Sequence, residues 1–92
     1  MTLKETKKSP AEDYNEKVVD KKHLILHNDD VHTFDYVIDA LIDICNHGYE
    51  QAAQCTMLVH YKGKCDVKRG GFEALKPMKE ALIERELEAT ID

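Results

Sequence analysis

The run KHLILH at residues 22–27 most tightly limits what this chain can fold into, because its two leucines alternate with Ile25 and the histidines. Leu24 and Leu26 fall on one face of an extended chain, whereas Ile25 and the two histidines fall on the other. An alternation with a period of two is typical of a β-strand that buries one face. We therefore expect the folded part to begin near Lys21 with a strand.

A helix is predicted after this strand. Asn28 begins a polar stretch that breaks the alternation, and apolar residues then recur at helical spacing over about 34–46. Thr33 has a side chain suited to cap the first turn. Gly48 is the expected stop signal at the other end.

The next segments predict a second helix and two strands. Overlapping stripes of small and apolar residues predict a helix over 49–61, closed by Gly63. The short run 64–68 alternates and predicts a strand, and the glycines that follow it indicate a turn at 69–71. A second alternating run predicts a last strand over 87–91.

A third helix is expected between those two strands, but Pro77 lies inside the pattern. Proline is costly within a helix and acceptable in its first turn. Either the helix is kinked, or it begins near Lys76 with 71–75 as a separate turn, and we favour a regular helix over about 76–86. The order β-α-α-β-α-β predicts an α+β fold, a three-stranded antiparallel sheet with helices packed on one face.

Composition separates a tail from one small domain. Residues 1–20 are rich in charged and polar side chains with almost no apolar periodicity, so we expect a disordered N-terminal extension. Residues 21–92 then form a single core domain, near the size at which one core is only modestly stabilising.

Several classes of function are disfavoured. A net charge of -5 argues against a nucleic-acid partner. No apolar run is long enough to span a membrane, and the N-terminus lacks a signal peptide. The spacing of Cys45, Cys55 and Cys65 matches no zinc or disulfide pattern, which indicates buried or half-buried reduced thiols in a cytoplasmic protein.

The stretch HNDDVHT at residues 27–33 concentrates the polar chemistry of the chain. Its aspartates and histidines, with His60, are able metal ligands, but none of the five histidines forms a ligand pair on a helix, so no metal is expected. Adjacent Asp29 and Asp30 make a poor acid–base pair, so an enzyme is not expected. Two interpretations remain open: a solvated loop, or a cradle for a cationic amine beside an apolar helix face.

Three segments together resemble the ClpS family of adaptors for the Clp protease. They are HLILHNDD…F.YVID.L, then E.A…MLVHYKGK, then a closing L.AT, and the resemblance covers roughly residues 21–92. The resemblance implies an adaptor that binds N-degrons and needs no cofactor. These are proteins whose first residue is a bulky apolar Phe, Tyr, Trp or Leu. It also implies a monomer that delivers them to the N-terminal domain of a ClpA-like AAA+ unfoldase.

The resemblance also implies a role for individual residues. Asn28, Asp29 and His60 would bind the free α-ammonium of the substrate, and Asp30 would support the loop. Lys76 would contact the unfoldase. The side-chain pocket would be lined by His32, Phe34, Val37, Thr56, Val59 and Leu87.

This chain departs from the family pattern at several of these positions. Phe34 and Thr56 stand where the family usually has methionines, which bears on the choice among Phe, Tyr, Trp and Leu. Gly71 stands where an acidic residue usually accompanies the lysine equivalent to Lys76. A generic protein-docking domain of similar fold, without recognition of N-terminal residues, is the alternative.

Overall fold

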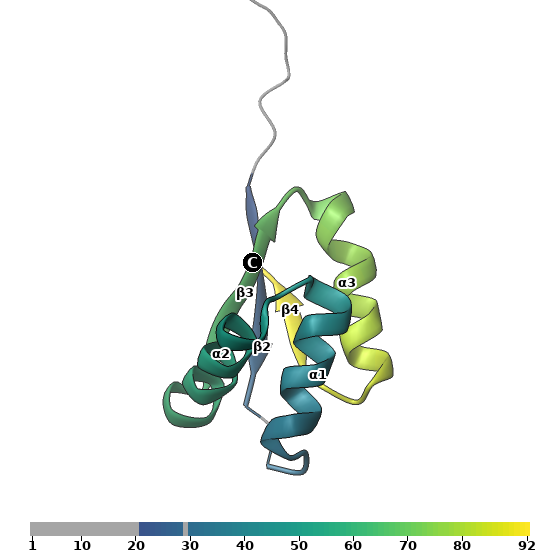
Figure 1. Ribbon diagram of the computed structural model, residues 1–92. Helices are drawn as coiled ribbons and strands as arrows, with labels where there is room; N and C mark the ends of the chain where they lie inside the picture. The colour runs from purple at the N-terminus through teal and green to yellow at the C-terminus, as the bar shows by residue number, and fades with distance from the viewer. Residues whose placement is uncertain (1–20, 29) are drawn as a thin grey trace, which may run out of the picture.

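The computed structural model describes residues 21–28 and 30–92, so the predicted extension over residues 1–20 and the predicted role of Asp29 lie outside them. The elements follow one another in the predicted order β-α-α-β-α-β (Figure 1). They are β2 (Lys22–His27), α1 (Phe34–Cys45), α2 (Tyr49–Lys62), β3 (Lys64–Gly70), α3 (Phe72–Glu84) and β4 (Ala89–Ile91).

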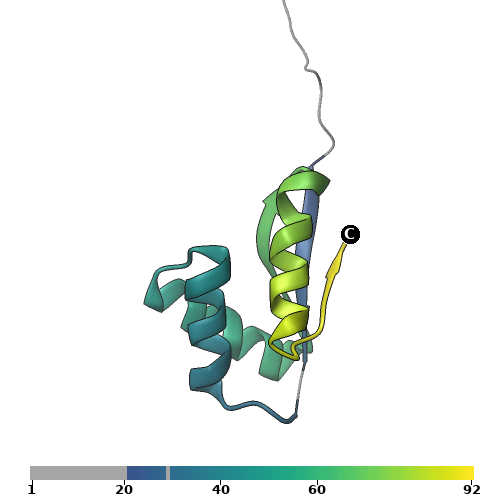
Figure 2. The same cartoon turned by 90° about the vertical axis from the view of Figure 1, so that its right-hand side faces the viewer.

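The three strands form one antiparallel sheet in the order β3-β2-β4, which confirms the predicted sheet. In the central strand β2, Leu26 lies opposite Cys65 of β3 and Ala89 of β4. The register with β3 shifts between Leu24 and Ile25, which marks a bulge. Strand β2 thus lies in the middle of the sheet, and the polar loop that follows it lies at one end of the domain (Figure 2).

Only one face of the central strand is buried, as the alternation predicts. Leu24 and Leu26 are fully buried, whereas Ile25 and the two histidines of β2 remain partly exposed. The helices cover the leucine face, and the fully buried leucines of the core come from β2 and from the helices. They are Leu24, Leu26, Leu41, Leu75 and Leu82.

The end of α1 corrects one sequence prediction. The helix stops at Cys45 because Asn46 adopts the left-handed conformation, with φ of 60°, and its backbone N–H bonds to Leu41. Asparagine tolerates this conformation better than most residues. The prediction that Gly48 stops α1 is therefore wrong, and Gly48 is instead the N-cap of α2.

The start of α3 was also predicted wrongly, since the helix begins at Phe72 and passes through Pro77. Its first turn is fixed by backbone N–H bonds from Ala74 and Leu75 to the carbonyl of Gly71. The Leu75 side chain is 1% exposed, and its burial helps offset the backbone bond that Pro77 removes.

The two outer strands differ from their predicted lengths. Strand β3 extends through Gly70, which pairs with Lys22, so Arg69 and Gly70 of the predicted turn belong to the strand and Gly71 is the N-cap of α3. Strand β4 covers only three residues, because Glu86 turns the chain with φ of 67° and Leu87 still bonds back to α3. Across residues 21–28 and 30–92, no helix is long and apolar enough to cross a membrane.

Candidate functional site

A cavity of about 190 Å³ opens where the loop after β2 meets the start of α1, the last turns of α2 and the segment before β4. Every residue predicted for the amine site and pocket that the structure describes lines this cavity. Its lining consists of Leu26, His27, Asn28, Asp30, His32, Thr33, Phe34, Val37, Thr56, Val59, His60 and Leu87.

Three lining residues were not predicted, namely Leu26, His27 and Thr33. The sequence marks Leu26 as core and Thr33 as a helix cap, and each residue keeps that role while it also lines the cavity. No local signal in the sequence would separate a core leucine from one that also faces a cavity. Lys76, predicted for the unfoldase, lies exposed on α3 and is not part of the lining.

The apolar part of the lining is deeply buried and comes from four elements or segments. Leu26 of β2, Val37 of α1, Val59 of α2 and Leu87 before β4 are each less than 8% exposed. Val37 follows Phe34 by three positions, which places both on one side of α1. These side chains belong to the main core, so the cavity is an extension of a well-packed interior.

Thr56 makes the α2 wall less polar than its residue type suggests. It is 3% exposed, and its hydroxyl donates a hydrogen bond of 2.8 Å to the carbonyl of Ala52, one turn earlier in α2. Because the hydrogen bond of this buried hydroxyl is already made within its own helix, an apolar ligand group can lie against Thr56 without leaving the hydroxyl unpaired.

Aromatic rings surround the polar end of the cavity. Phe34 and His60 meet edge to face with 5.3 Å between ring centroids, and His60 meets Tyr61 in the same way at 4.8 Å. His32 stacks on Tyr36 with 4.4 Å between centroids and 14° between ring planes. These contacts order the rings that line or support the mouth of the cavity.

Backbone bonds hold the segments around this mouth. The N–H of Asn28 donates to the carbonyl of Gly63 at 2.9 Å, which ties the start of the polar loop to the end of α2. The hydroxyl of Thr33 accepts from the N–H of Tyr36 at 3.1 Å and so caps α1, as predicted. The polar loop is thus fixed at Asn28 and again at Thr33.

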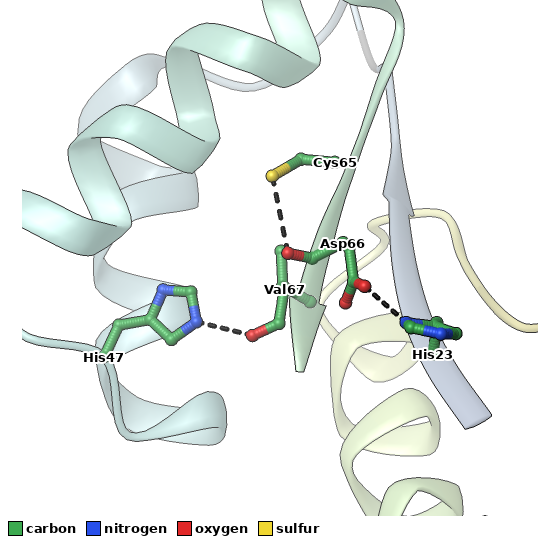
Figure 3. A network of polar contacts seen from close by, with 5 residues as sticks. All are labelled: His23, His47, Cys65, Asp66 and Val67. Carbon is green, nitrogen blue, oxygen red and sulfur yellow. Dashed lines mark hydrogen bonds and ion pairs between the residues drawn. The ribbon is translucent and has the colours of Figure 1, made fainter. Parts of the chain in front are cut away.

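The three cysteines lie outside the cavity lining and are free thiols, as predicted. Burial raises the pKa of the Cys45 thiol to about 11 and that of the half-buried Cys65 thiol to about 12. Cys65 also contacts the carbonyl of Asp66, and the carbonyl of the next residue, Val67, bonds to His47 (Figure 3). Thiols in this state are protonated near neutral pH and are poor nucleophiles.

The site combines an apolar interior with a polar mouth. Asn28, Asp30, His32 and His60 all line the same cavity as the buried apolar residues. Such a lining suits a compact apolar group joined to a polar or cationic group. Within the described part of the chain, no three His, Cys, Asp or Glu side chains gather as a ligand set for a metal ion.

The fold and the cavity define a small α+β domain that carries one mixed apolar and polar cavity at the end of its central strand. A family model described as ATP-dependent Clp protease adaptor protein ClpS matches residues 17–90. The chain therefore belongs to the ClpS family.

Similar curated proteins bear the same family name. Two are named ATP-dependent Clp protease adapter protein ClpS, one from Campylobacter jejuni subsp. jejuni (strain 81-176) and one from C. jejuni subsp. doylei (strain 269.97). Each is 37% identical over 62 residues, which are 67% of this chain and 56% of the relative. The chain thus spans little more than half the length of the curated relatives that it matches.

Proposed function

We propose that this protein is an adaptor of the Clp protease that binds N-degrons. Its ligand is the first residue of a protein, a bulky apolar Phe, Tyr, Trp or Leu with a free α-amino group. The observation that carries the proposal is that Asn28 and His60, far apart in sequence, line one cavity with Val37, Val59 and Leu87.

The polar mouth would bind the α-ammonium. Asn28, Asp29 and His60 accept its three N–H donors, and Asp30 supports the loop and adds negative charge. Hydrogen bonds from an ammonium to a carboxylate are about twice as strong as neutral ones. A blocked amine, or a residue inside a chain, offers no such cation and leaves the carboxylate without its partner, which gives selectivity for a true N-terminus.

The apolar interior would bind the first side chain. The buried walls formed by Leu26, Val37, Val59 and Leu87 are already in place around the empty volume. Burial of a large apolar side chain in a preformed pocket contributes roughly 1.5–3 kcal/mol. His32, Phe34 and Thr56 complete the lining and differ most from the family pattern, so preference among the four first residues should depend on them.

Delivery would follow recognition. The family is described as an adaptor of an ATP-dependent protease, which supports a division of labour in which the partner would cleave bonds and this domain would only bind and deliver. The partner is the N-terminal domain of a ClpA-like AAA+ unfoldase in the cytoplasm. Lys76 is exposed on α3 and available for that contact.

A generic docking domain is the second candidate, favoured by exposed apolar side chains along α2. Tyr49, Met57, Leu58 and Tyr61 are each more than 40% exposed. A partner bound through this face would not need the cavity. Val37→Ala would then leave binding of the partner intact, whereas the N-degron proposal predicts weaker binding.

Fluorescence anisotropy with short labelled peptides tests the proposal. Peptides that begin with Phe, Tyr, Trp or Leu are each compared with the N-acetylated form of the same sequence. The proposal predicts binding of the free forms and at least tenfold weaker binding of the acetylated forms. Equal affinity for both forms, or no binding of either, contradicts it.

A further inference from the structure

We infer that Tyr36 is a positioning residue that sets the size selectivity of the cavity, although it does not line the cavity itself. The inference rests on the proposed function and extends it to a residue outside the binding set. Tyr36 makes two contacts near the lining at once: its ring contacts the lining residue His32, and its hydroxyl bonds to Arg85, two residues before the lining residue Leu87.

The ring of Tyr36 makes the first contact. It stacks on the imidazole of His32 with centroids 4.4 Å apart and planes 14° from parallel. His32 lies in the loop before α1 and lines the cavity, whereas Tyr36 lies within the first turn of α1. Because Tyr36 is held in the capped first turn of α1, its stacked ring restrains the position of the His32 imidazole in the loop at the cavity mouth.

The hydroxyl of Tyr36 makes the second contact. It donates a hydrogen bond of 2.8 Å to the carbonyl of Arg85, the C-cap residue of α3. The Arg85 side chain returns to α1 through a contact of 3.2 Å with Asp43. Leu87, which forms one wall of the cavity, follows only two residues later.

The turn between Arg85 and Leu87 needs such a restraint. Glu86 has φ of 67°, a left-handed conformation that L side chains rarely adopt. Its N–H bonds to Ile83, and the N–H of Leu87 bonds to Leu82. Two long-range bonds join this turn to α1: the exposed Arg85–Asp43 contact and the bond from the Tyr36 hydroxyl. The Tyr36 bond is the one made to the backbone of the turn, and so it helps to fix how far the Leu87 wall stands from the walls on α1.

The distance between these walls decides which first side chains pack well. Dispersion contacts weaken steeply when a gap of even half an ångström opens. A small side chain such as Leu depends on close walls, whereas Trp fills a wider cavity. Loss of the Tyr36 hydroxyl should therefore weaken binding of Leu-initiated peptides more than binding of Trp-initiated ones.

The test compares Tyr36→Phe with a matched control, Tyr49→Phe. Both changes delete one hydroxyl, but Tyr49 is 65% exposed at the start of α2 and does not line the cavity. Affinities for free Leu- and Trp-initiated peptides are measured by anisotropy well below the unfolding temperature. In Tyr36→Phe we expect the ratio of Leu to Trp affinity to fall about two- to tenfold, the equivalent of one hydrogen bond, and in Tyr49→Phe to stay unchanged.

Methyl NMR of the free protein supplies a second readout, which does not need a peptide. The Leu87 methyl signals should move in Tyr36→Phe and stay in place in Tyr49→Phe. An unchanged affinity ratio, including a uniform loss for both peptides, or unmoved Leu87 methyls, overturns the inference while the proposed function stands. A wild-type protein that binds no free peptide contradicts the proposed function, and this inference with it.

Discussion

The imidazole of His60 on α2 and the phenyl ring of Phe34, the first residue of α1, meet edge to face with 5.3 Å between ring centroids. The two residues are 26 positions apart, and both line the candidate cavity. The pair thus joins a residue proposed for amine binding to one proposed for the side-chain pocket. Substitutions at either position should therefore affect both parts of the site.

Replacement of Phe34 by leucine keeps an apolar lining but removes the edge-to-face contact with His60. We expect the Phe34→Leu variant to bind a Phe-initiated peptide more weakly, by up to about 0.5–1.5 kcal/mol, the usual energy of an aromatic pair, because His60 loses the contact that orients its imidazole at the mouth. Anisotropy measures this, and a double-mutant cycle with His60→Ala should return a coupling energy of the same size. Tyr49→Leu, another replacement of an aromatic residue by leucine at an exposed site outside the cavity, is the control. Additive effects in the cycle would contradict the coupling.

Replacement of Thr56 by methionine adds volume to a wall that is 3% exposed. Excess volume in a packed site typically costs about 1–3 kcal/mol. We expect Thr56→Met to weaken binding of Trp-initiated peptides most, because these need the whole cavity. Thr56→Val nearly keeps the volume, and the hydroxyl that it loses bonds only within α2, so it should change the affinity little. Equal effects of the two variants on the Trp-initiated peptide would refute this account.

His47 should matter for stability although it lies away from the cavity. It is 5% exposed and bonds to the carbonyl of Val67 at 2.6 Å, which ties the α1–α2 connection to β3 (Figure 3). His47→Ala leaves a void and an unpaired carbonyl, and should lower the free energy of unfolding by roughly 2–4 kcal/mol.

His23→Ala is the control for that experiment. His23 pairs with Asp66 on the exposed side of the sheet, and such pairs contribute about 0–1 kcal/mol. Urea unfolding of both variants checks the expectation. A similar loss in the two variants would show that the His47 bond has no special role.

The Cys45 thiol should make the fold less stable in alkali. Burial raises its pKa to about 11, whereas the unfolded chain has the ordinary value of 9.0. Above pH 9 the unfolded state loses this proton and the folded state keeps it, so the free energy of unfolding falls as pH rises toward 11. The loss for this group is on the order of 2 kcal/mol.

Urea unfolding in reductant at pH 7.5, 9 and 10.5 measures this slope. The Cys45→Ala variant removes the thiol and serves as the reference, since other groups titrate equally in both proteins. We expect the difference in stability between wild type and variant to shrink as pH rises. A difference that stays constant with pH would mean that the Cys45 thiol does not contribute to the slope.

Much of the fold could be predicted from local patterns, because the alternation at Leu24 and Leu26 and the caps at Thr33 and Gly63 act through nearby backbone. The errors at the helix ends have two causes, one a tertiary contact and one a local backbone conformation. Pro77 sits inside α3 because Leu75 anchors the first turn in the core. Asn46, rather than a glycine, ends α1.

In the candidate site too, the residue types could be predicted from the sequence, whereas their arrangement depends on contacts between distant segments. The residue types at Asn28 and His60 are visible in the sequence, but their meeting at one cavity needs the fold, and only the family resemblance anticipated it. The support of His32 by Tyr36 has no sequence signal. A tyrosine on an amphipathic helix usually indicates only a boundary position, and its bond to Arg85 spans 49 residues.

The most direct test of the central claim is a cycle that crosses Asp29→Asn with acetylation of a Phe-initiated peptide, measured by titration calorimetry. The claim is that the polar loop recognises a free α-ammonium. Asp29→Asn nearly keeps the shape and removes the charge, so it should weaken binding of the free peptide by about 1.5–3 kcal/mol. It should leave the already weak binding of the acetylated peptide almost unchanged. Equal losses for the two peptides, or no loss for either, would contradict the claim.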